Sequence, residues 1–269
     1  MVLQINLFVY YKSIQYMMNT QDKNIHILTK RLGETPFQCV DRYKKDNPAL
    51  RYVPITYAGR LDPMAEGLLL GLSGEAIAKK EEYLNLGKTY EFDVLWEFDT
   101  DTSDILGIVS GDDLTLFPTV DEVKTEIKKH IGQFEQKYPA YSSQTVGGKS
   151  LIEWSRLGRI REVEIPSHTV ELFSVEHLSR RFVSGQDLLD NIVARIGLVN
   201  GDFRQQEIST KWKKLLEHKK EKLFTIDKLS ADVSGGFYVR QFVVDIAKNL
   251  GTLATTYHIQ RNRIGEFTI

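Results

Sequence analysis

The chain has 269 residues, of which 42% are hydrophobic and 26% are charged, and its formal net charge at pH 7 is -1. This is the composition of an ordinary globular protein, and it excludes a chain that attracts nucleic acid through its overall charge. The single cysteine, Cys39, excludes an internal disulfide, and the lack of Cys/His spacing typical of metal sites favours a metal-free protein of the reducing cytoplasm.

Residues 1–20 contain a short apolar cluster, without a basic segment before it or a small-residue cleavage site after it. No segment approaches the roughly 20 apolar residues of a membrane span. We therefore expect neither a membrane segment nor a secretory signal. The pattern favours an N-terminal extension over residues 1–23 or an additional strand there, and an organellar leader stays open.

The first regular elements follow this extension. Residues 25–28 (Ile-His-Ile-Leu) predict a short strand, and residues 30–36 predict the turn after it. Pro36 and the helical spacing of the apolar residues behind it predict a helix over residues 37–45. Cys39 lies in an apolar stretch of this helix, so we expect a buried structural thiol.

The next segment is a polar turn that passes into an apolar run, residues 59–70, with the sequence Gly-Arg-Leu-Asp-Pro-Met-Ala-Glu-Gly-Leu-Leu-Leu. Pro63 restricts Asp62 to an extended conformation, and the flanking glycines permit close backbone approach. Asp62 is therefore presented as a candidate nucleophile. The same residues also suit a helix start, with Asp62 as N-cap and Pro63 in the first helical position. Residues 68–72 predict a buried central strand.

The middle of the chain alternates between helical and extended patterns. Residues 74–86 predict a helix, because apolar side chains and lysines separate onto two sides. In residues 88–96 apolar side chains from Tyr90 onward alternate with polar ones, which predicts a strand with one buried and one wet face. On this pattern alone, Tyr90 is a cross-strand packing aromatic.

Three further segments carry local signals. Residues 100–107 hold Asp, Ser and Thr side chains that can bond nearby backbone, which predicts a turn without a catalytic role. Residues 120–134 predict an amphipathic helix, since apolar residues recur at spacings of three and four. Residues 168–177 predict another strand.

The segment 182–222 is helical and basic. Residues 186–199 carry an apolar helical stripe, and residues 211–222 contain the densest run of lysines in the chain. An exposed lysine face would suit RNA phosphates, and it would equally suit a solvated amphipathic helix.

The last segments are a strand over residues 229–233 and a helix over residues 240–249, with Gly251 beyond the helix end. Arg240 lies near the start of this helix, where the helix dipole disfavours a cation. We therefore expect a carboxylate partner for Arg240.

Five segments match a set of motifs in a fixed order. Residues 59–69 fit G-x-L-D-x-x-A-x-G-x-L, and residues 100–107 are close to T-D-T-x-D-x-x-G. Shorter segments are similar to K-x-Y at Tyr90, to S-K-G-x-Y-I-R at residues 234–240 and to L-R-R-T-x-V-G at residues 259–265. The set resembles the TruB-type tRNA pseudouridine-55 synthases.

The resemblance implies a set of site residues. Asp62 would be the catalytic residue, Arg240 would pair with it, and Tyr90 would stack on the target base. Tyr238 and Ile259 would wall the pocket. Two further residues are implied to bind substrate in segments that match the family only in part, namely Tyr57 and Lys30.

The chain also departs from the family pattern. Tyr57 stands at the family's histidine, where it would stack on a base or serve as plain packing. Thr145 and Gly235 each stand where many members have lysine. About forty residues at 182–222 replace a short hairpin connection.

The implied fold is α+β, a mixed and mostly antiparallel sheet with flanking helices, which is the pseudouridine synthase fold, interrupted by a helical insertion at about residues 182–222. Residues 24–269 would form one catalytic domain that stops after the last motif, without the additional C-terminal RNA-binding domain common in the family.

The implied activity is that of an isomerase that converts a uridine of tRNA, U55 of the T loop, to pseudouridine. Neither metal nor any other cofactor is expected, and the partner would be the tRNA T stem-loop. We expect a cytoplasmic monomer, without membrane association. Whether Asp62 acts as nucleophile or as base stays open.

Two other functions are also open. One is a pseudouridine synthase that acts on a different RNA position. The other is a non-catalytic RNA-binding protein on the same fold. Against the second stands the joint presence of Asp62, Tyr90, Tyr238 and Arg240, because binding an anionic backbone needs no carboxylate.

Overall fold

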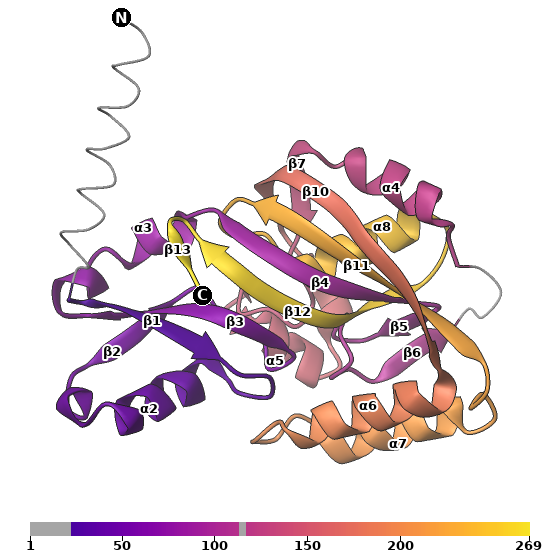
Figure 1. The fold of residues 1–269 in the computed structure, drawn as a ribbon, viewed down its shortest axis with the longest axis horizontal. Helices are drawn as coiled ribbons and strands as arrows, with labels where there is room; N and C mark the ends of the chain where they lie inside the picture. The colour runs from indigo at the N-terminus through magenta and orange to yellow at the C-terminus, as the bar shows by residue number, and fades with distance from the viewer. Residues whose placement is uncertain (1–22, 113–116) are drawn as a thin grey trace, which may run out of the picture.

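The computed structural model describes residues 23–112 and 117–269 (Figure 1). The expected strand or extension over residues 1–20 lies outside the described residues. The strands are β1 (Ile25–Lys30), β2 (Ile55–Ala58), β3 (Ala65–Ser73), β4 (Lys88–Trp96), β5 (Phe98–Thr100), β6 (Val109–Asp112), β7 (Gly132–Lys137), β8 (Thr145–Val146), β9 (Lys149–Ser150), β10 (Ser167–Ser184), β11 (Leu223–Val233), β12 (Ala254–Ile264) and β13 (Phe267–Thr268). The α-helices are α2 (Pro36–Asp46), α3 (Lys80–Asn85), α4 (Val120–Lys128), α5 (Leu151–Arg156), α6 (Gly185–Gly197), α7 (Gln205–Leu216) and α8 (Val239–Asn249).

One nine-stranded sheet forms the body of the molecule (Figure 1). Its strands follow the order β1-β3-β12-β4-β11-β10-β7, while β2 and β13 pair with β3 and β12 outside this path. Among the described strands of this sheet, β3 and β12 run parallel and the other neighbours run antiparallel. The predicted α+β class, with a mixed and mostly antiparallel sheet and flanking helices, is confirmed.

Strand β3 lies inside the sheet and carries the apolar run of the sequence. It forms antiparallel pairs with β1 and β2 and a parallel pair with β12. Almost all of its residues are buried. The predicted buried strand over residues 68–72 is therefore confirmed. Because β3 starts at Ala65, its position fixes where the preceding turn ends.

Strand β4 differs from its prediction, because its second half is buried on both faces. Phe92 and Trp96 pack into a core with α8 and α4, whereas Leu95 packs into a second core with α6 and α7. The expected wet face is therefore present only near the start of the strand. The cause is α6 and α7, which cover the side of the sheet opposite α8.

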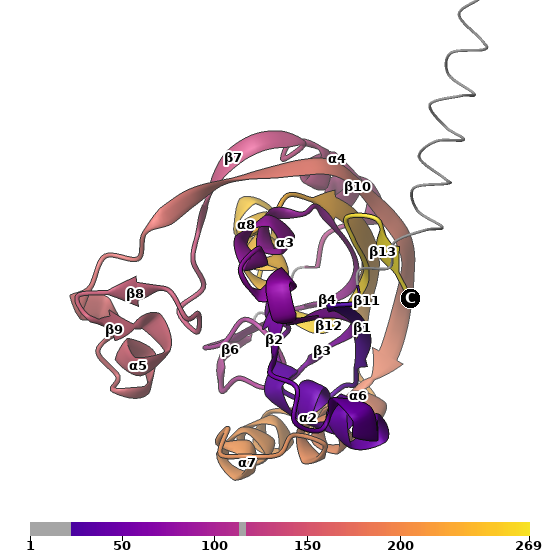
Figure 2. The same cartoon turned by 90° about the vertical axis from the view of Figure 1, so that its left-hand side faces the viewer.

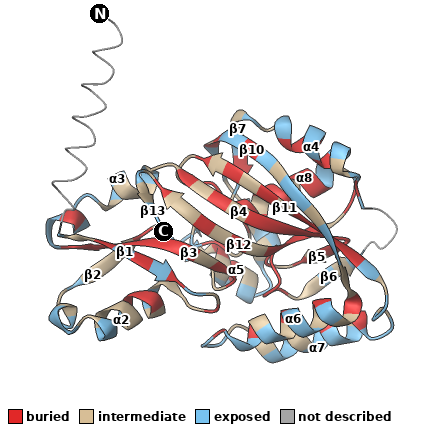
Figure 3. Ribbon diagram, in the orientation of Figure 1, coloured by how far each residue is buried: buried red, intermediate tan, exposed pale blue. Residues whose placement is uncertain are grey.

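Helices α6 and α7 come from the connection between β10 and β11, where the sequence predicts a helical insertion. They run side by side below the sheet (Figure 1), and their buried residues include Leu188, Ile192 and Trp212. Their outer faces are largely exposed (Figure 3). The amphipathic prediction for these segments is confirmed.

Side-chain caps define where several helices begin. Thr35, Thr119 and Ser150 each accept a hydrogen bond from the backbone N–H three residues later, and a Gln or Glu at that position accepts one from the cap's own N–H. Each capping box satisfies donors that a helix start leaves unpaired. The predicted helix over residues 37–45 is confirmed as α2.

Two predicted helices are wrong in part. The segment 74–86 forms a short 3₁₀ turn, Gly74–Ile77, followed by the brief helix α3. The predicted helix over residues 120–134 ends at Lys128, and Phe134 lies in β7. Gly132 has φ +109°, a conformation that ends a helix and that glycine adopts readily.

A projecting arm, residues 138–166, connects β7 to β10 and contains β8, β9 and α5. Figure 2 shows it standing away from the sheet. Inside the arm, the indole N–H of Trp154 donates to the carbonyl of Val146 at 2.9 Å, which ties α5 to the small hairpin. Across the described part of the chain, no helix combines the length and apolar character needed to span a membrane.

Candidate active site

Asp62 lies between β2 and β3, where it opens the turn over residues 62–65 that leads into β3. Its carbonyl oxygen accepts a hydrogen bond from the N–H of Ala65 at 3.0 Å. Because no helix follows, the alternative interpretation of Asp62 as a helix N-cap is wrong. The carboxylate side chain is 40% exposed, so it remains accessible to a ligand.

The turn that carries Asp62 rests on two buried cations. The guanidinium of Arg261 donates to the carbonyl oxygens of Leu68 (2.8 Å), Arg60 and Gly59 (both 3.3 Å). Lys30 Nζ donates to the carbonyl oxygen of Ala65 at 2.5 Å. These bonds satisfy buried carbonyl groups and fix the backbone on both sides of Asp62.

Gly67 is required for this arrangement. Its φ is +106°, and an added Cβ would collide with the backbone carbonyl oxygen of Arg261. Strands β3 and β12 therefore approach closely at this point, where Gly67 pairs with Arg261 in the parallel register. The glycine of the motif serves strand packing beneath the turn that carries Asp62.

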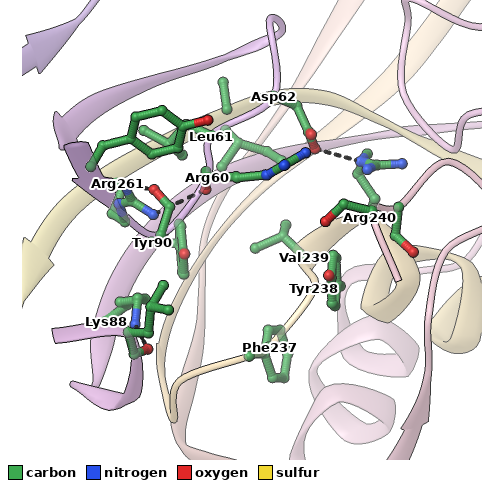
Figure 4. Close-up of a pocket in the computed structure, with 18 of the residues that line it drawn as sticks. Arg60, Leu61, Asp62, Lys88, Tyr90, Phe237, Tyr238, Val239, Arg240 and Arg261 are labelled. Atoms are coloured by element: carbon green, nitrogen blue, oxygen red, sulfur yellow. Dashed lines mark hydrogen bonds and ion pairs between the residues drawn. The ribbon is translucent and has the colours of Figure 1, made fainter. Parts of the chain in front are cut away.

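Arg240 has the carboxylate partner that the sequence predicts. Its Nε donates to Asp62 Oδ2 at 2.7 Å, and its Nη1 and Nη2 donate to the carbonyl oxygens of Thr102 (2.6 Å) and Tyr141 (3.2 Å). Its side chain is only 4% exposed. Figure 4 shows the ion pair at one end of the pocket. The three bonds hold the guanidinium in one orientation, so it can orient Asp62 in turn.

The loop at residues 100–107 also belongs to the site, although the sequence predicts only a turn there. Asp104 Oδ2 lies 3.9 Å from Arg240 Nε, and Asp104 Oδ1 accepts hydrogen bonds from the Thr102 hydroxyl and the Leu106 N–H. Burial raises the pKa of Asp104 to about 6, against the attraction of Arg240. Arg240 is thus shared between an exposed and a buried carboxylate.

A cavity of about 400 Å³ opens beside Asp62. Tyr90 and Ile259 line it from the paired strands β4 and β12, and Tyr238 lines it from the residue before α8. Tyr57 lines it from β2. The structure therefore brings these four residues together with Asp62 and Arg240, as the sequence predicts.

The aromatic walls suit a flat, uncharged ring. Tyr90 is almost fully buried in β4, opposite Arg261 of β12, so its orientation is fixed by the sheet. Burial raises the pKa of the Tyr238 phenol, and the nearby charge of Asp62 raises it further. Tyr238 is thus a neutral wall of the cavity.

Lys30 is corrected from a substrate-binding residue to a supporting one. Its side chain is fully buried, and it lies beneath the turn instead of lining the cavity. Burial lowers its pKa to about 8, although the charge of Asp62 partly offsets this. The contact with Ala65 depends on tertiary structure, which the local turn sequence does not reveal.

Lys88, the lysine of the K-x-Y motif, lines the cavity, although the sequence analysis assigned it no role. Its Nζ donates to the carbonyl oxygens of Leu84 (2.9 Å) and Leu86 (2.6 Å), and burial lowers its pKa to about 8. Lys88 lies two residues before Tyr90. Because side chains alternate along a strand, both lie on the same face of β4, and this alternation was the signal that could have identified Lys88 as a lining residue.

The arrangement combines one accessible carboxylate, one buried cation that orients it, and an aromatic pocket. It can present an oxygen nucleophile or a base to a planar ligand with an adjoining sugar. Within residues 23–112 and 117–269, no three His, Cys, Asp or Glu side chains are grouped so that they could hold a metal ion.

Comparison with known proteins gives a consistent result. Residues 49–187 match the model of the TruB family pseudouridylate synthases, N-terminal domain. The tRNA pseudouridine synthase B of Nostoc sp. is 36% identical over 154 residues, which cover 57% of this chain and 50% of that protein. The tRNA pseudouridine synthase B of Fusobacterium nucleatum is 26% identical over 247 residues, which cover 92% of this chain and 69% of that protein.

A solved structure shares the fold. The chain superimposes on a protein in the crystal structure of a Cbf5-Nop10-Gar1 complex with a TM-score of 0.54 and 18% sequence identity. The match covers 91% of this chain and 50% of that chain. The present chain spans about half the length of the first curated relatives it matches.

Proposed function

The chain belongs to the TruB family of pseudouridylate synthases, and on that premise we propose that it isomerises U55 in the T loop of tRNA to pseudouridine. The observation that carries the proposal is the Asp62–Arg240 pair at the end of an aromatic cavity. A carboxylate on an RNA-binding surface repels phosphate, so its buried cationic support is better explained by catalysis than by binding.

The reaction is balanced without a cofactor. The bond between N1 of uracil and C1′ of ribose breaks, the uracil turns in place, and C5 forms the new bond to C1′. The proton that C5 loses is matched by the proton that N1 gains, so the product is an isomer of the substrate. Asp62 acts either as a nucleophile on the sugar or as a base that removes a proton. Both roles need an oriented carboxylate, and the bond from Arg240 provides that orientation.

The walls of the cavity supply the remaining requirement, which is to hold the detached uracil. Tyr90 is positioned to stack on the base, Tyr238 and Ile259 enclose it, and Tyr57 also lines the cavity. Extracting a base from a loop costs a few kcal/mol, which stacking must offset. Tyr90 also lies where it could relay the C5 proton.

The proposal also covers the compartment, the oligomeric state and the cofactor requirement of the protein. It acts on RNA as a cytoplasmic monomer, without metal, cofactor or membrane. A single cysteine fits a reducing compartment. The Cys39 thiol is buried, and burial raises its pKa to about 11, so it is poorly nucleophilic and does not compete with Asp62.

The test is incubation of the purified protein with an unmodified tRNA transcript, followed by chemical mapping of pseudouridine at every uridine. We expect modification at U55, loss of that signal with Asp62→Ala, and no signal in a transcript with cytidine at position 55. Modification at another uridine would overturn the assignment to U55. Binding without modification would overturn tRNA as the substrate.

A further inference from the structure

A second cavity, of about 520 Å³, adjoins the first at the turn that carries Asp62. The residues that line both cavities are Tyr57, Arg60, Leu61, Asp62, Tyr141, Ile152 and Arg240. The remaining walls of the second cavity come from the start of α2, the 100–107 loop, the arm and a turn at residues 202–204 that precedes α7. The two cavities therefore meet at the catalytic carboxylate.

The second cavity offers an aromatic surface. Phe37, at the second position of α2, is 73% exposed, and Phe203 of the 202–204 turn also lines the cavity. A phenyl ring that exposed is unfavourable in water and is available for stacking. Stacking of a base on an aromatic side chain stabilises the complex and tolerates any base.

The cavity also offers free cations. Arg60 and Arg156 line it and are exposed, and within the described residues neither forms an ion pair. Arg204 lines it as well, but its guanidinium is paired with Asp101 at 2.7 Å. Asp202 adds one exposed carboxylate at the rim. Planar guanidinium groups bind phosphate oxygens well.

We propose that the second cavity binds the nucleotide adjacent to the target uridine, with its base on Phe37 and its phosphate at Arg60 and Arg156. The proposal rests on the proposed function, since it requires the target uracil in the first cavity. A strand that places one base at Asp62 passes Tyr57 and Arg60, which line both cavities. The neighbouring nucleotide then meets the second cavity directly.

The helical insertion completes this subsite. Arg204 has φ +62° and ψ +27°, a left-handed conformation that is uncommon for a non-glycine residue. Its side chain lies over the ring of Tyr141, 5.2 Å from the ring centroid, and the Tyr141 hydroxyl donates to Asp101 at 3.1 Å. These contacts hold the 202–204 turn against the 100–107 loop, so the insertion forms a fixed wall of the cavity.

The experiment measures RNA binding in a background that carries Asp62→Asn, which removes turnover. Two stem-loop RNAs are compared with the intact one, each with an abasic site at one neighbour of the target. We expect Phe37→Ala to weaken binding of intact RNA about tenfold, a loss typical of one stacked base. One abasic RNA should bind about tenfold more weakly to the parent protein and lose nothing further with Phe37→Ala.

The matched control is Phe173→Ala on β10, whose ring is 52% exposed and lines neither cavity. It should leave all three affinities unchanged. If the losses from Phe37→Ala and from each abasic site simply multiply, or if Phe37→Ala has no effect, the subsite is overturned.

The arginine half of the proposal is tested by Arg156→Ala against Arg51→Ala, an exposed arginine outside both cavities. Arg156→Ala should make the dependence of log affinity on log salt less steep by the amount expected for one lost phosphate contact. Arg51→Ala should leave the slope unchanged. Equal slopes for the two variants would remove Arg156 from the subsite. Pseudouridine formation by the Asp62 protein is scored separately, so its absence would refute the proposed function while the binding data still decide on the subsite.

Discussion

One exposed carboxylate depends on three buried cations. Arg240 orients Asp62 directly, whereas Arg261 and Lys30 bind the carbonyl groups of the turn that carries it. Buried cations are costly unless they are paired or hydrogen-bonded, so their concentration at one turn indicates a functional constraint. The residue-level predictions concern two groups around this turn whose pKa values are strongly shifted, Asp104 and Lys30.

Asp104 should impose a pH dependence on the reaction. Its pKa is raised to about 6, so it is neutral below pH 6 and ionised above. Ionised Asp104 attracts Arg240 from 3.9 Å and helps to fix the guanidinium. We expect the single-turnover rate with saturating RNA to rise with pH through an inflection near 6.

The variant Asp104→Asn should remove that inflection and lower the rate above pH 7 by about tenfold, which corresponds to about 1.4 kcal/mol. Asn retains a carbonyl oxygen for the Leu106 N–H, so the loop should persist. An unchanged profile in Asp104→Asn would assign the inflection to another group.

Lys30 should make stability depend on pH. The folded-state pKa of about 8 lies below the ordinary value of 10.5, so between these values the unfolded chain binds a proton that the folded chain releases. The free energy of unfolding therefore gains a positive slope from Lys30 as pH rises through this window, at most about 1.4 kcal/mol per pH unit.

Chemical denaturation at pH 7 and pH 9.5 measures this effect. The difference in unfolding free energy between wild type and Lys30→Met should become more favourable to wild type at the higher pH. Lys45→Met, at an exposed position, should show the same difference at both pH values. If the difference in unfolding free energy between wild type and Lys30→Met does not depend on pH, the prediction that Lys30 has a lowered pKa in the folded protein is refuted.

The strands could be predicted from the sequence better than the helices. Alternation identifies β4, and the uninterrupted apolar run identifies β3, because a short apolar run between glycines is typical of a buried strand. Residues 120–134 were wrongly predicted as one helix, since Phe134 faces the core both at a helical spacing and in strand β7. The second buried face of β4 could not be predicted, because the helices that cover it come from residues 185–216.

The residues of the site also fall into those that the sequence could predict and those that it could not. Asp62, Tyr90, Tyr238 and Arg240 could be placed from motifs, and the structure brings them together. The contribution of Asp104 could not be predicted, because its bonds to Thr102 and Leu106 are already those of a turn residue. Its contact with Arg240 joins segments more than a hundred residues apart, which no local pattern reveals.

The contact between the insertion and the loop at residues 100–107 gives a prediction at the level of elements. Arg204 binds Asp101 and covers Tyr141, whose carbonyl group accepts from Arg240. We expect Arg204→Ala to lower the single-turnover rate by about three- to tenfold, because the pair is partly exposed and other bonds still hold Arg240. Thermal stability should change little.

A double-mutant cycle with Asp101→Asn separates this role from general destabilisation. If Arg204 acts through Asp101, the double variant should lose no more rate than the slower single variant. Arg195→Ala is the matched control from the same insertion, because Arg195 binds the Tyr257 carbonyl away from Asp101. Additive losses in the cycle would refute the coupling.

The whole molecule has nearly balanced charge, so its affinity for RNA must come from local cationic surfaces. Helix α7 starts beside the second cavity and presents three exposed lysines, namely Lys211, Lys213 and Lys214. Replacing all three by Gln should reduce the slope of log affinity against log salt by about 0.7 to 0.9 for each phosphate that is no longer neutralised. The rate with saturating RNA should not change.

The matched control replaces three exposed lysines of α4 and its end, namely Lys124, Lys128 and Lys129. Helix α4 lies above the sheet and α7 lies below it (Figure 1), so this variant should keep the wild-type slope. Equal slopes for both triple variants would show that α7 is a solvated helix that does not bind RNA.

The central claim is that Asp62 performs the reaction. The most direct test compares wild type with Asp62→Asn, which preserves the shape of the side chain, in single-turnover formation of pseudouridine in a tRNA transcript. We predict that Asp62→Asn binds the RNA within about threefold of wild type and forms pseudouridine at least about a thousandfold more slowly. Turnover by Asp62→Asn at a rate close to that of wild type would contradict this role of Asp62.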